Sequence, residues 1–288
     1  MIDNEDLDRP VLRAGRVSRT YDRVAFRSDR LPTAHFDQRF SDENLAFWVP
    51  LLVEAAQIEP HSDVLDVGCG TGGFARAIAR MASARVTGCD RSERFIAFAR
   101  GLPPPEDGTV EWVVGDAEEL PFAPCSFDRV LLSLVLHQLA RPPAAIAEAG
   151  RALRPDGIVL VRTIAPEDAV HRVPERYVPA MAAADAARMP PIETLVEWLE
   201  RAGFTDVKPE RHLRNKALTL ADEERALRTE VRSRYRFVTV DELEEGIGRM
   251  RADAAATRGD WIDPRPTFII VARKQTESMR PARLGAET

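Results

Sequence analysis

The chain has 288 residues, of which 44% are hydrophobic, and its formal net charge is -6. This composition supports a large folded core and gives no general attraction to nucleic acid or to an anionic membrane. No apolar run reaches the length of a membrane span, and the acidic start MIDNEDLDRP lacks the features of a signal peptide. We therefore expect a cytoplasmic protein with neither a nucleic acid nor a membrane as partner; the sequence leaves its oligomeric state open.

The cysteines and histidines are not spaced as the ligands of a metal ion are. Cys69, Cys89 and Cys125 lack a C-x-x-C pattern, and the five histidines are dispersed along the chain. Neither a disulfide framework nor a zinc site is indicated, so we expect no metal. The cysteines are interpreted as small buried apolar residues.

The N-terminal part of the chain is charged and weakly patterned up to residue 20. Residues 41–57 then predict a helix, with Ser41 as its N-cap and Pro50 as the site of a kink. Its apolar residues recur at helical spacing: Leu45, Trp48, Leu52 and Ala55. Residues 1–57 are expected to form a helical cap or lid.

The middle of the chain alternates strictly between short apolar runs and helical patterns. Runs rich in Val, Ile and Leu, separated by helices, are typical of buried parallel strands in a doubly wound α/β sheet. The predicted strands are 63–68, 84–90, 109–116, 126–134 and 157–163, and the predicted helices are 72–81, 92–102 and 142–157.

Beyond residue 163 the alternation breaks. Residues 164–190 are rich in proline, alanine and charge and predict a loop or lid, whereas 191–204 predict an amphipathic helix. The rest is expected to contain two strands, at 205–213 and 266–273, and two helices, at 219–235 and 239–256. The tail, 275–288, is expected to be disordered. We interpret residues 58–274 as one α/β domain with helical insertions near 164–190 and 213–259.

The stretch VLDVGCGTGGFARAIA, residues 64–79, allows two interpretations. Gly68, Gly70 and Gly73 fit G-x-G-x-x-G, the fingerprint of a dinucleotide-binding turn. Asp66, however, lies two residues before the first glycine, where a buried carboxylate would repel a pyrophosphate and have a raised pKa. The same carboxylate suits a ligand that carries positive charge, such as S-adenosylmethionine with its sulfonium and ammonium groups.

Several spaced motifs resemble those of class I S-adenosylmethionine-dependent methyltransferases. The first motif of that family, D-x-G-x-G-x-G, corresponds to Asp66, Gly68, Gly70 and Gly72. The segments RVTGCD, GDAEELPFAPCSFD, SLVLHQL and RALRPDGIVLV follow in the family's order. The resemblance covers roughly residues 60–165 and is similar to the small-molecule branch, which includes ubiquinone and menaquinone C-methyltransferases.

This resemblance implies a Rossmann-like, seven-stranded sheet, mostly parallel with an antiparallel last strand, plus a helical cap. It also implies S-adenosyl-L-methionine as cofactor, S-adenosyl-L-homocysteine as product and a small-molecule acceptor. Asp90 corresponds to the acid that holds the ribose hydroxyls, Asp116 to the residue that meets the adenine amino group, and Ser133 to the strand end near the methionine moiety. The expected cofactor-binding residues are Tyr21, Asp66, Gly68, Cys69, Gly70, Gly72, Asp90, Arg91, Asp116, Ala117, Ser133 and Leu134.

The residues on the acceptor side carry alternatives. His137 is a candidate general base or a packing residue, and Tyr21 either closes over the cofactor or packs. The arginines of residues 223–236 form either a solvated helix face or a clamp for an acidic substrate. Aromatic residues line an acceptor pocket or pack in the core: Phe26, Phe36, Phe40 and Trp48. We expect residues 1–57, 164–190 and 213–259 to cover the site.

Three functions remain open from the sequence. The first is methyl transfer to a small molecule, at oxygen, nitrogen or carbon. The second is an enzyme that cyclises or eliminates the cofactor, and the third is a non-catalytic cofactor-binding partner protein. The intact acids Asp66, Asp90 and Asp116 argue against the third.

Overall fold

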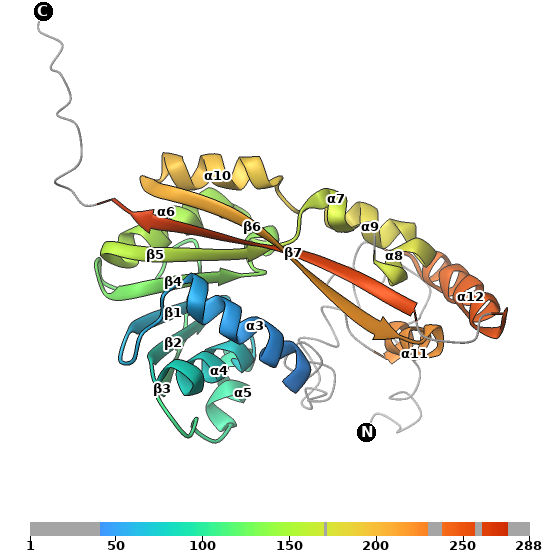
Figure 1. The fold of residues 1–288 in the computed structure, drawn as a ribbon, viewed down its shortest axis with the longest axis horizontal. Helices are drawn as coiled ribbons and strands as arrows, with labels where there is room; N and C mark the ends of the chain where they lie inside the picture. The colour runs from blue at the N-terminus through green and yellow to red at the C-terminus, as the bar shows by residue number, and fades with distance from the viewer. Residues whose placement is uncertain (1–40, 170–171, 230–237, 257–260, 276–288) are drawn as a thin grey trace, which may run out of the picture. The chain divides into compact units, whose positions relative to one another are not determined.

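The computed structural model describes residues 41–169, 172–229, 238–256 and 261–275 (Figure 1). They belong to two compact units, which we call the sheet unit and the helical unit. Of the described residues, the sheet unit comprises 45–163, 192–210 and 269–275. The helical unit comprises 41–44, 164–169, 172–191, 211–229, 238–256 and 261–268. Within the described ranges, no helix is long and apolar enough to cross a membrane.

Seven strands form one sheet in the order β3-β2-β1-β4-β5-β7-β6, which confirms the predicted doubly wound fold. The pairs β1–β2, β2–β3, β1–β4 and β4–β5 are parallel, and β7 runs antiparallel to them (Figure 1). The strands are β1 (Asp63–Val67), β2 (Arg85–Asp90), β3 (Thr109–Val114), β4 (Phe127–Ser133), β5 (Leu153–Thr163), β6 (Phe204–Leu218) and β7 (Trp261–Lys274). The last two strands are longer than predicted.

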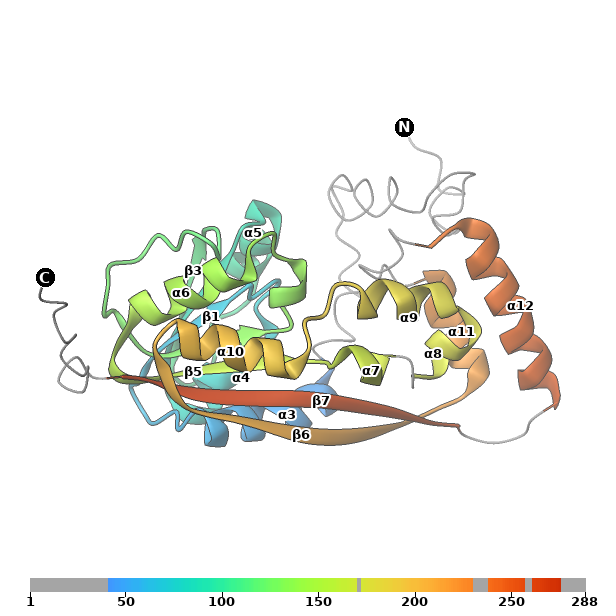
Figure 2. The same cartoon turned by 90° about the horizontal axis from the view of Figure 1, so that it is seen from above.

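Helices cover both faces of the sheet unit. Figures 1 and 2 show α6 and α10 on one face and α3 and α4 on the other. This division follows from right-handed crossovers that leave β1 and β4 in opposite directions along the sheet. The helices are α3 (Asp42–Ala55), α4 (Gly73–Ala82), α5 (Glu93–Gly101), α6 (Pro142–Ala152) and α10 (Ile192–Arg201), with a 3-10 helix, η3, at Leu136–Gln138.

The central strands are buried on both sides, as parallel strands between helices should be. Val64 and Leu65 of β1, Leu131 of β4 and Leu160 of β5 are all fully buried. Because β1 and β4 are neighbours whose crossovers diverge, their carboxyl ends flank the switch point where ligands bind in such sheets. This edge is the place to search for a functional site.

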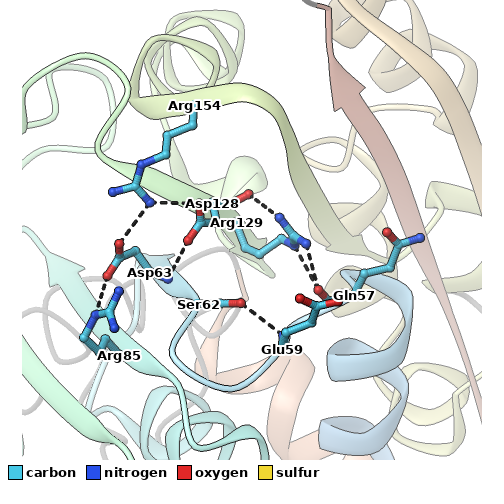
Figure 3. Close-up of polar contacts among 8 residues, drawn as sticks. All are labelled: Gln57, Glu59, Ser62, Asp63, Arg85, Asp128, Arg129 and Arg154. Carbon is cyan, nitrogen blue, oxygen red and sulfur yellow. Dashed lines mark hydrogen bonds and ion pairs between the residues drawn. The ribbon is translucent and has the colours of Figure 1, made fainter.

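The amino edge of the sheet carries a polar network (Figure 3). Arg154 Nη1 lies 2.9 Å from Asp63 Oδ2 and 2.8 Å from Asp128 Oδ1, and Arg85 Nε donates to Asp63 Oδ1 at 2.7 Å. The backbone N–H of Asp63 donates to Asp128 Oδ2 at 2.8 Å. The hydrogen bond from Arg85 is the main reason that the pKa of Asp63 is lowered. These contacts join the amino ends of β1, β2, β4 and β5.

Helix α3 begins as predicted, but most of it is part of the sheet unit. Ser41 Oγ accepts a hydrogen bond from the Asn44 N–H at 3.3 Å, as an N-cap does. From residue 45 onward the helix is part of the sheet unit, because Trp48, Val49 and Leu52 are buried there. The expected cap or lid of residues 1–57 as a whole stays a prediction, because residues 1–40 lie outside the described ranges.

Helix α6 ends earlier than predicted. The expected helix extended to residue 157, whereas α6 ends at Ala152 and β5 begins at Leu153. Leu153 already has extended backbone angles, with φ -70 and ψ 141. Pro155 disfavours a helical conformation at Arg154, so the helix cannot reach the proline.

The helical unit has a hydrophobic core of its own. Residues 164–190, predicted as a loop or lid within a helical insertion, contain three short helices, α7 (Pro166–Ala169), α8 (Val173–Tyr177) and α9 (Pro179–Ala186). The unit also contains α11 (Leu220–Thr229) and α12 (Val240–Ala256). The core includes Tyr177, Met181, Leu227, Ile247 and Met250. The sequence predicted helical insertions in a single domain, and the second hydrophobic core was not predicted.

Candidate functional site

A glycine loop connects β1 to α4 at the carboxyl edge of the sheet. Gly68, Gly70 and Gly72 all have positive φ angles, of 72, 57 and 82. A Cβ at Gly72 would lie 2.1 Å from Trp112 Cη2, so this position is filled by packing. A Cβ at Gly70 would meet no atom of the described residues within 4 Å. The loop therefore presents bare backbone to open space at Gly70, where a ligand can approach closely.

The end of β2 holds this loop through hydrogen bonds. The N–H groups of Gly68 and Cys69 donate to the Cys89 carbonyl at 2.7 and 3.1 Å. The Asp90 carboxylate accepts from the Gly70 N–H at Oδ2 and from the Ser92 N–H at Oδ1, both at 2.9 Å. A carboxylate has about four acceptor positions, so Asp90 retains capacity for two hydroxyl donors of a ligand.

Asp66 lies beneath the loop and is 3% exposed. The pKa of this carboxyl group is raised to about 7: burial is the main cause, the neighbouring Asp90 adds to it, and Arg162 opposes both. The raised pKa expected from the sequence is confirmed. The sheet unit thus holds a carboxyl group that is close to half ionised at neutral pH.

The ends of β2 and β3 bring further predicted residues to this edge. The Gly115 N–H donates to the Asp90 carbonyl at 3.1 Å, which brings the exposed Asp116 beside Asp90. Asp116 Oδ1 accepts from the Glu118 N–H at 2.9 Å, and Ala117 is buried. Arg91 is exposed next to Asp90.

The end of β4 carries local backbone strain. Leu134 has a φ of 55, a left-handed conformation that leucine rarely adopts. Its N–H donates to the Arg162 carbonyl at 2.8 Å, and Ser133 before it is half-buried. Val135 packs against Gly68, where an added Cβ would lie 2.4 Å from Val135 Cγ2. Strain of this kind concentrates at functional sites, and here it adjoins the glycine loop.

The cysteine prediction is confirmed for two residues and wrong for the third. Cys69 and Cys89 are buried, and burial raises the pKa of both thiols, that of Cys89 to about 12. Cys125 is exposed. It lies with a φ of 57 in the turn before β4, where its N–H donates to the Arg151 carbonyl at 3.0 Å. A turn at the sheet surface leaves no core for its side chain.

The acceptor-side residues are only partly within the described ranges. His137 is half-buried in η3, directly after β4, and its role as a base stays a prediction. Trp48 packs in the core, which favours the packing alternative for this residue. Tyr21, Phe26, Phe36 and Phe40 lie outside the described residues, as does the tail from residue 276. The expected cover over the site also stays a prediction.

The arginines of the basic run that the structure describes have acidic partners. Arg225 pairs with Asp222 at 2.8 Å, and Arg228 pairs with Glu224 at 3.2 Å and with Glu244 at 3.0 Å. This supports the solvated helix face. The arginines between residues 230 and 237 lie outside the described ranges.

Sequence reasoning missed one residue, Arg162 near the end of β5. It is 5% exposed, and its guanidinium carbon lies 4.6 Å from the centroid of the Trp48 ring and 4.7 Å from that of Phe74. The signal was available, because a charge interrupts the apolar run IVLVRT. Among the residues that the structure describes, no group of three His, Cys, Asp or Glu side chains could hold a metal ion.

Comparisons with known proteins agree with this geometry. Residues 65–161 match a family described as "Methyltransferase domain". The chain is 35% identical over 152 residues to the ubiquinone/menaquinone biosynthesis C-methyltransferase UbiE of Paracoccus denitrificans, covering 52% of this chain and 59% of that protein. It is 31% identical over 167 residues to the UbiE protein of Dinoroseobacter shibae, covering 50% of this chain and 67% of that protein.

The chain belongs to the class I S-adenosylmethionine-dependent methyltransferases. A solved structure of a protein from an antibiotic biosynthesis pathway of Anabaena variabilis shares the fold, with a TM-score of 0.62 and 24% identity. That match covers 78% of this chain and 96% of the other.

The residues that match the family model include most of the candidate site. The matched residues, 65–161, include the glycine loop, Asp90, Asp116 and Ser133, and they end one residue before Arg162. All of them lie in the sheet unit. The chain spans 59% of the length of the Paracoccus relative.

Proposed function

We propose that the protein binds S-adenosyl-L-methionine and transfers its methyl group to a small-molecule acceptor, releasing S-adenosyl-L-homocysteine (EC 2.1.1.-). The observation that carries this proposal is the buried carboxyl of Asp66 beneath a glycine loop that Asp90 holds in place. A ligand with an ammonium and a sulfonium group gains from a carboxylate there, whereas a pyrophosphate would be repelled.

The residues at the carboxyl edge fit this cofactor. Asp90 has remaining acceptor positions for two ribose hydroxyls, and the open space at Gly70 leaves room for the adenosyl group. The exposed carboxylate of Asp116 is suited to accept from the adenine amino group. Asp66, Ser133 and Leu134 would orient the methionine end of the cofactor. Cys69, Arg91 and Ala117 would complete the lining of the cofactor site.

When bound, the cofactor supplies an electrophilic methyl group on a sulfonium. The contribution of this chain is to hold and align the reactants and to exclude water, which suffices for an amine or a stabilised carbanion. An acceptor hydroxyl would gain from a base, and His137, in η3 shortly after β4, is the candidate for that role. The two UbiE relatives are C-methyltransferases by name. The family match covers only residues 65–161 of the sheet unit, which hold the proposed cofactor site, so we assign methyl transfer without choosing oxygen, nitrogen or carbon as the acceptor atom.

The test is a product analysis. The purified chain is incubated with S-adenosyl-L-methionine that carries a deuterated methyl group, together with a small-molecule extract of the host, and analysed by mass spectrometry. We expect a labelled acceptor and an equal amount of S-adenosyl-L-homocysteine. Consumption of the cofactor to a cyclised or eliminated product, with no labelled acceptor, would contradict methyl transfer. Binding without any turnover would favour a non-catalytic partner protein.

A further inference from the structure

Arg162 and Asp66 lie on the same face of the sheet. Asp66 of β1 is in register with Leu131 of β4, and Leu131 with Leu160 of β5. Register partners in neighbouring strands share a face, and so do residues two apart in one strand. Arg162 is therefore on the face of Asp66, two strands or about 10 Å across and one step closer to the carboxyl edge.

Two aromatic rings fix the guanidinium of Arg162 in this position. Its carbon Cζ lies 4.6 Å from the ring centroid of Trp48 in α3 and 4.7 Å from that of Phe74 in α4. Both rings are buried. Phe74 is the second residue of α4, immediately after the glycine loop, so Arg162 also packs against the start of this helix. A cation between two desolvated rings is held more firmly than one in solvent.

The charged neighbours of Asp66 make Arg162 its counter-charge. Arg162 from β5 favours the ionised form of this carboxyl group, whereas burial and Asp90 from β2 oppose it. The thiols of Cys69 and Cys89 also interact electrostatically with Asp66, and both stay protonated at neutral pH because burial raises their pKa. Helices α3 and α4 present rings to this cluster. Asp66 and Arg162 are thus buried, interacting charges of opposite sign on one face of the sheet.

We propose that Arg162 is a positioning residue, which acts through Asp66 by holding this carboxylate charged and in place beneath the glycine loop for the cofactor. The proposal rests on the proposed function. Arg162 itself does not touch the cofactor. Loss of its charge leaves the buried Asp66 with Asp90 as its charged neighbour, and Asp66 then takes up a proton at a higher pH.

The test is the affinity for S-adenosyl-L-homocysteine, measured by titration calorimetry between pH 5.5 and 9 for wild type, Arg162→Met and Arg162→Lys. In the wild type we expect affinity to fall as the pH drops through about 7, where Asp66 becomes protonated. Arg162→Met should move this midpoint upward by about 0.5–1 pH unit, whereas Arg162→Lys should keep it close to wild type.

Two controls separate this role from general damage. In the Asp66→Asn background, Arg162→Met should have no further effect on the pH profile, because the group through which it acts is gone. Arg129→Gln removes another half-buried arginine, which binds the carbonyls of Ala56 and Gln57 at the amino edge of the sheet. It should lower the melting temperature and leave the midpoint unchanged. If Arg162→Met does not fold, Arg162→Gln takes its place.

The possible results are distinct. A folded Arg162→Met with the wild-type midpoint would overturn the proposal and leave the proposed function standing. So would an equal loss of affinity at every pH that persists in the Asp66→Asn background, because it indicates direct contact with the cofactor. A wild type that binds no S-adenosyl-L-homocysteine at any pH would overturn the proposed function, and this proposal with it.

Discussion

Asp66 is kept at a cost to the stability of the sheet unit. Its carboxyl group is 3% exposed and its pKa is raised to about 7, so the folded state disfavours its ionised form. A side chain that destabilises the fold is expected at a site that serves a ligand rather than the core. The same residue should therefore influence stability and binding in opposite directions.

Asp66→Asn should raise the stability of the protein without ligand and weaken its binding of S-adenosyl-L-homocysteine. Because the folded pKa of about 7 lies above the ordinary aspartate value of 3.8, the Asp66 contribution to stability falls as pH rises between these values and stays low above 7. Thermal melts should show a gain of roughly 2–6 °C at pH 8 and little gain at pH 4. A lower melting temperature at pH 8 would show that the carboxylate stabilises the fold.

Asp90→Ala should reduce the affinity for S-adenosyl-L-homocysteine by roughly 10–150-fold, because it removes a charged hydrogen-bond acceptor worth about 1.5–3 kcal/mol. His137→Ala should leave this affinity nearly unchanged whatever its effect on turnover. Asp107→Ala removes a charge from an exposed loop residue and is the matched control. Calorimetry checks all three. Loss of binding in His137→Ala with Asp90→Ala unaffected would refute the placement of the site.

At the scale of elements, two glycines of the loop should respond differently to substitution. Gly70→Ala adds a Cβ that would contact none of the residues that the structure describes, but it does so at a residue with a φ of 57. We expect a loss of stability of about 1–2 kcal/mol and a larger loss of cofactor affinity. Gly72→Ala forces a Cβ to 2.1 Å from the Trp112 ring and should mainly destabilise the fold. Urea unfolding measures the loss of stability, and calorimetry measures the loss of cofactor affinity. If the ratio of affinity loss to stability loss were the same for both variants, the predicted difference between the two glycines would be contradicted.

The amino-edge network should stabilise the sheet independently of the site. The pKa of Asp63 is lowered, so its contribution to stability is complete above the ordinary aspartate value of 3.8 and is lost as pH falls through the lower folded value. Asp63→Asn should cost roughly 1–2 kcal/mol at pH 7, after allowance for solvent screening, and less at pH 3. Urea midpoints at the two pH values measure this. A cost that grows on acidification would contradict the ion-pair explanation.

The elements of the sheet were predictable because their signals are local. Runs such as VLDV and RVTGCD are apolar over the length of one strand, and Ser92 caps α5 as its residue type suggests. Failures came where tertiary packing decides. The three short helices in residues 164–190 bury residues such as Met181 in a core formed with α11 and α12, and a short window of sequence does not reveal such a core.

At the scale of the whole molecule, the candidate site was predictable where the chain places residues at strand ends in a fixed order. Asp66, Asp90, Asp116 and Ser133 follow this rule. Arg162 does not, since its relation to Asp66 depends on the register of β1, β4 and β5 and on rings from two helices. The division into two units was also hidden, because each unit is assembled from segments far apart in the sequence.

The most direct test of the central claim is a calorimetric titration of the wild-type chain with S-adenosyl-L-homocysteine and, separately, with NADH. A buried carboxyl under the glycine loop should admit the first ligand and repel the pyrophosphate of the second. We expect micromolar binding of S-adenosyl-L-homocysteine and no heat of binding with NADH. Binding of NADH, with none of S-adenosyl-L-homocysteine, would contradict the account.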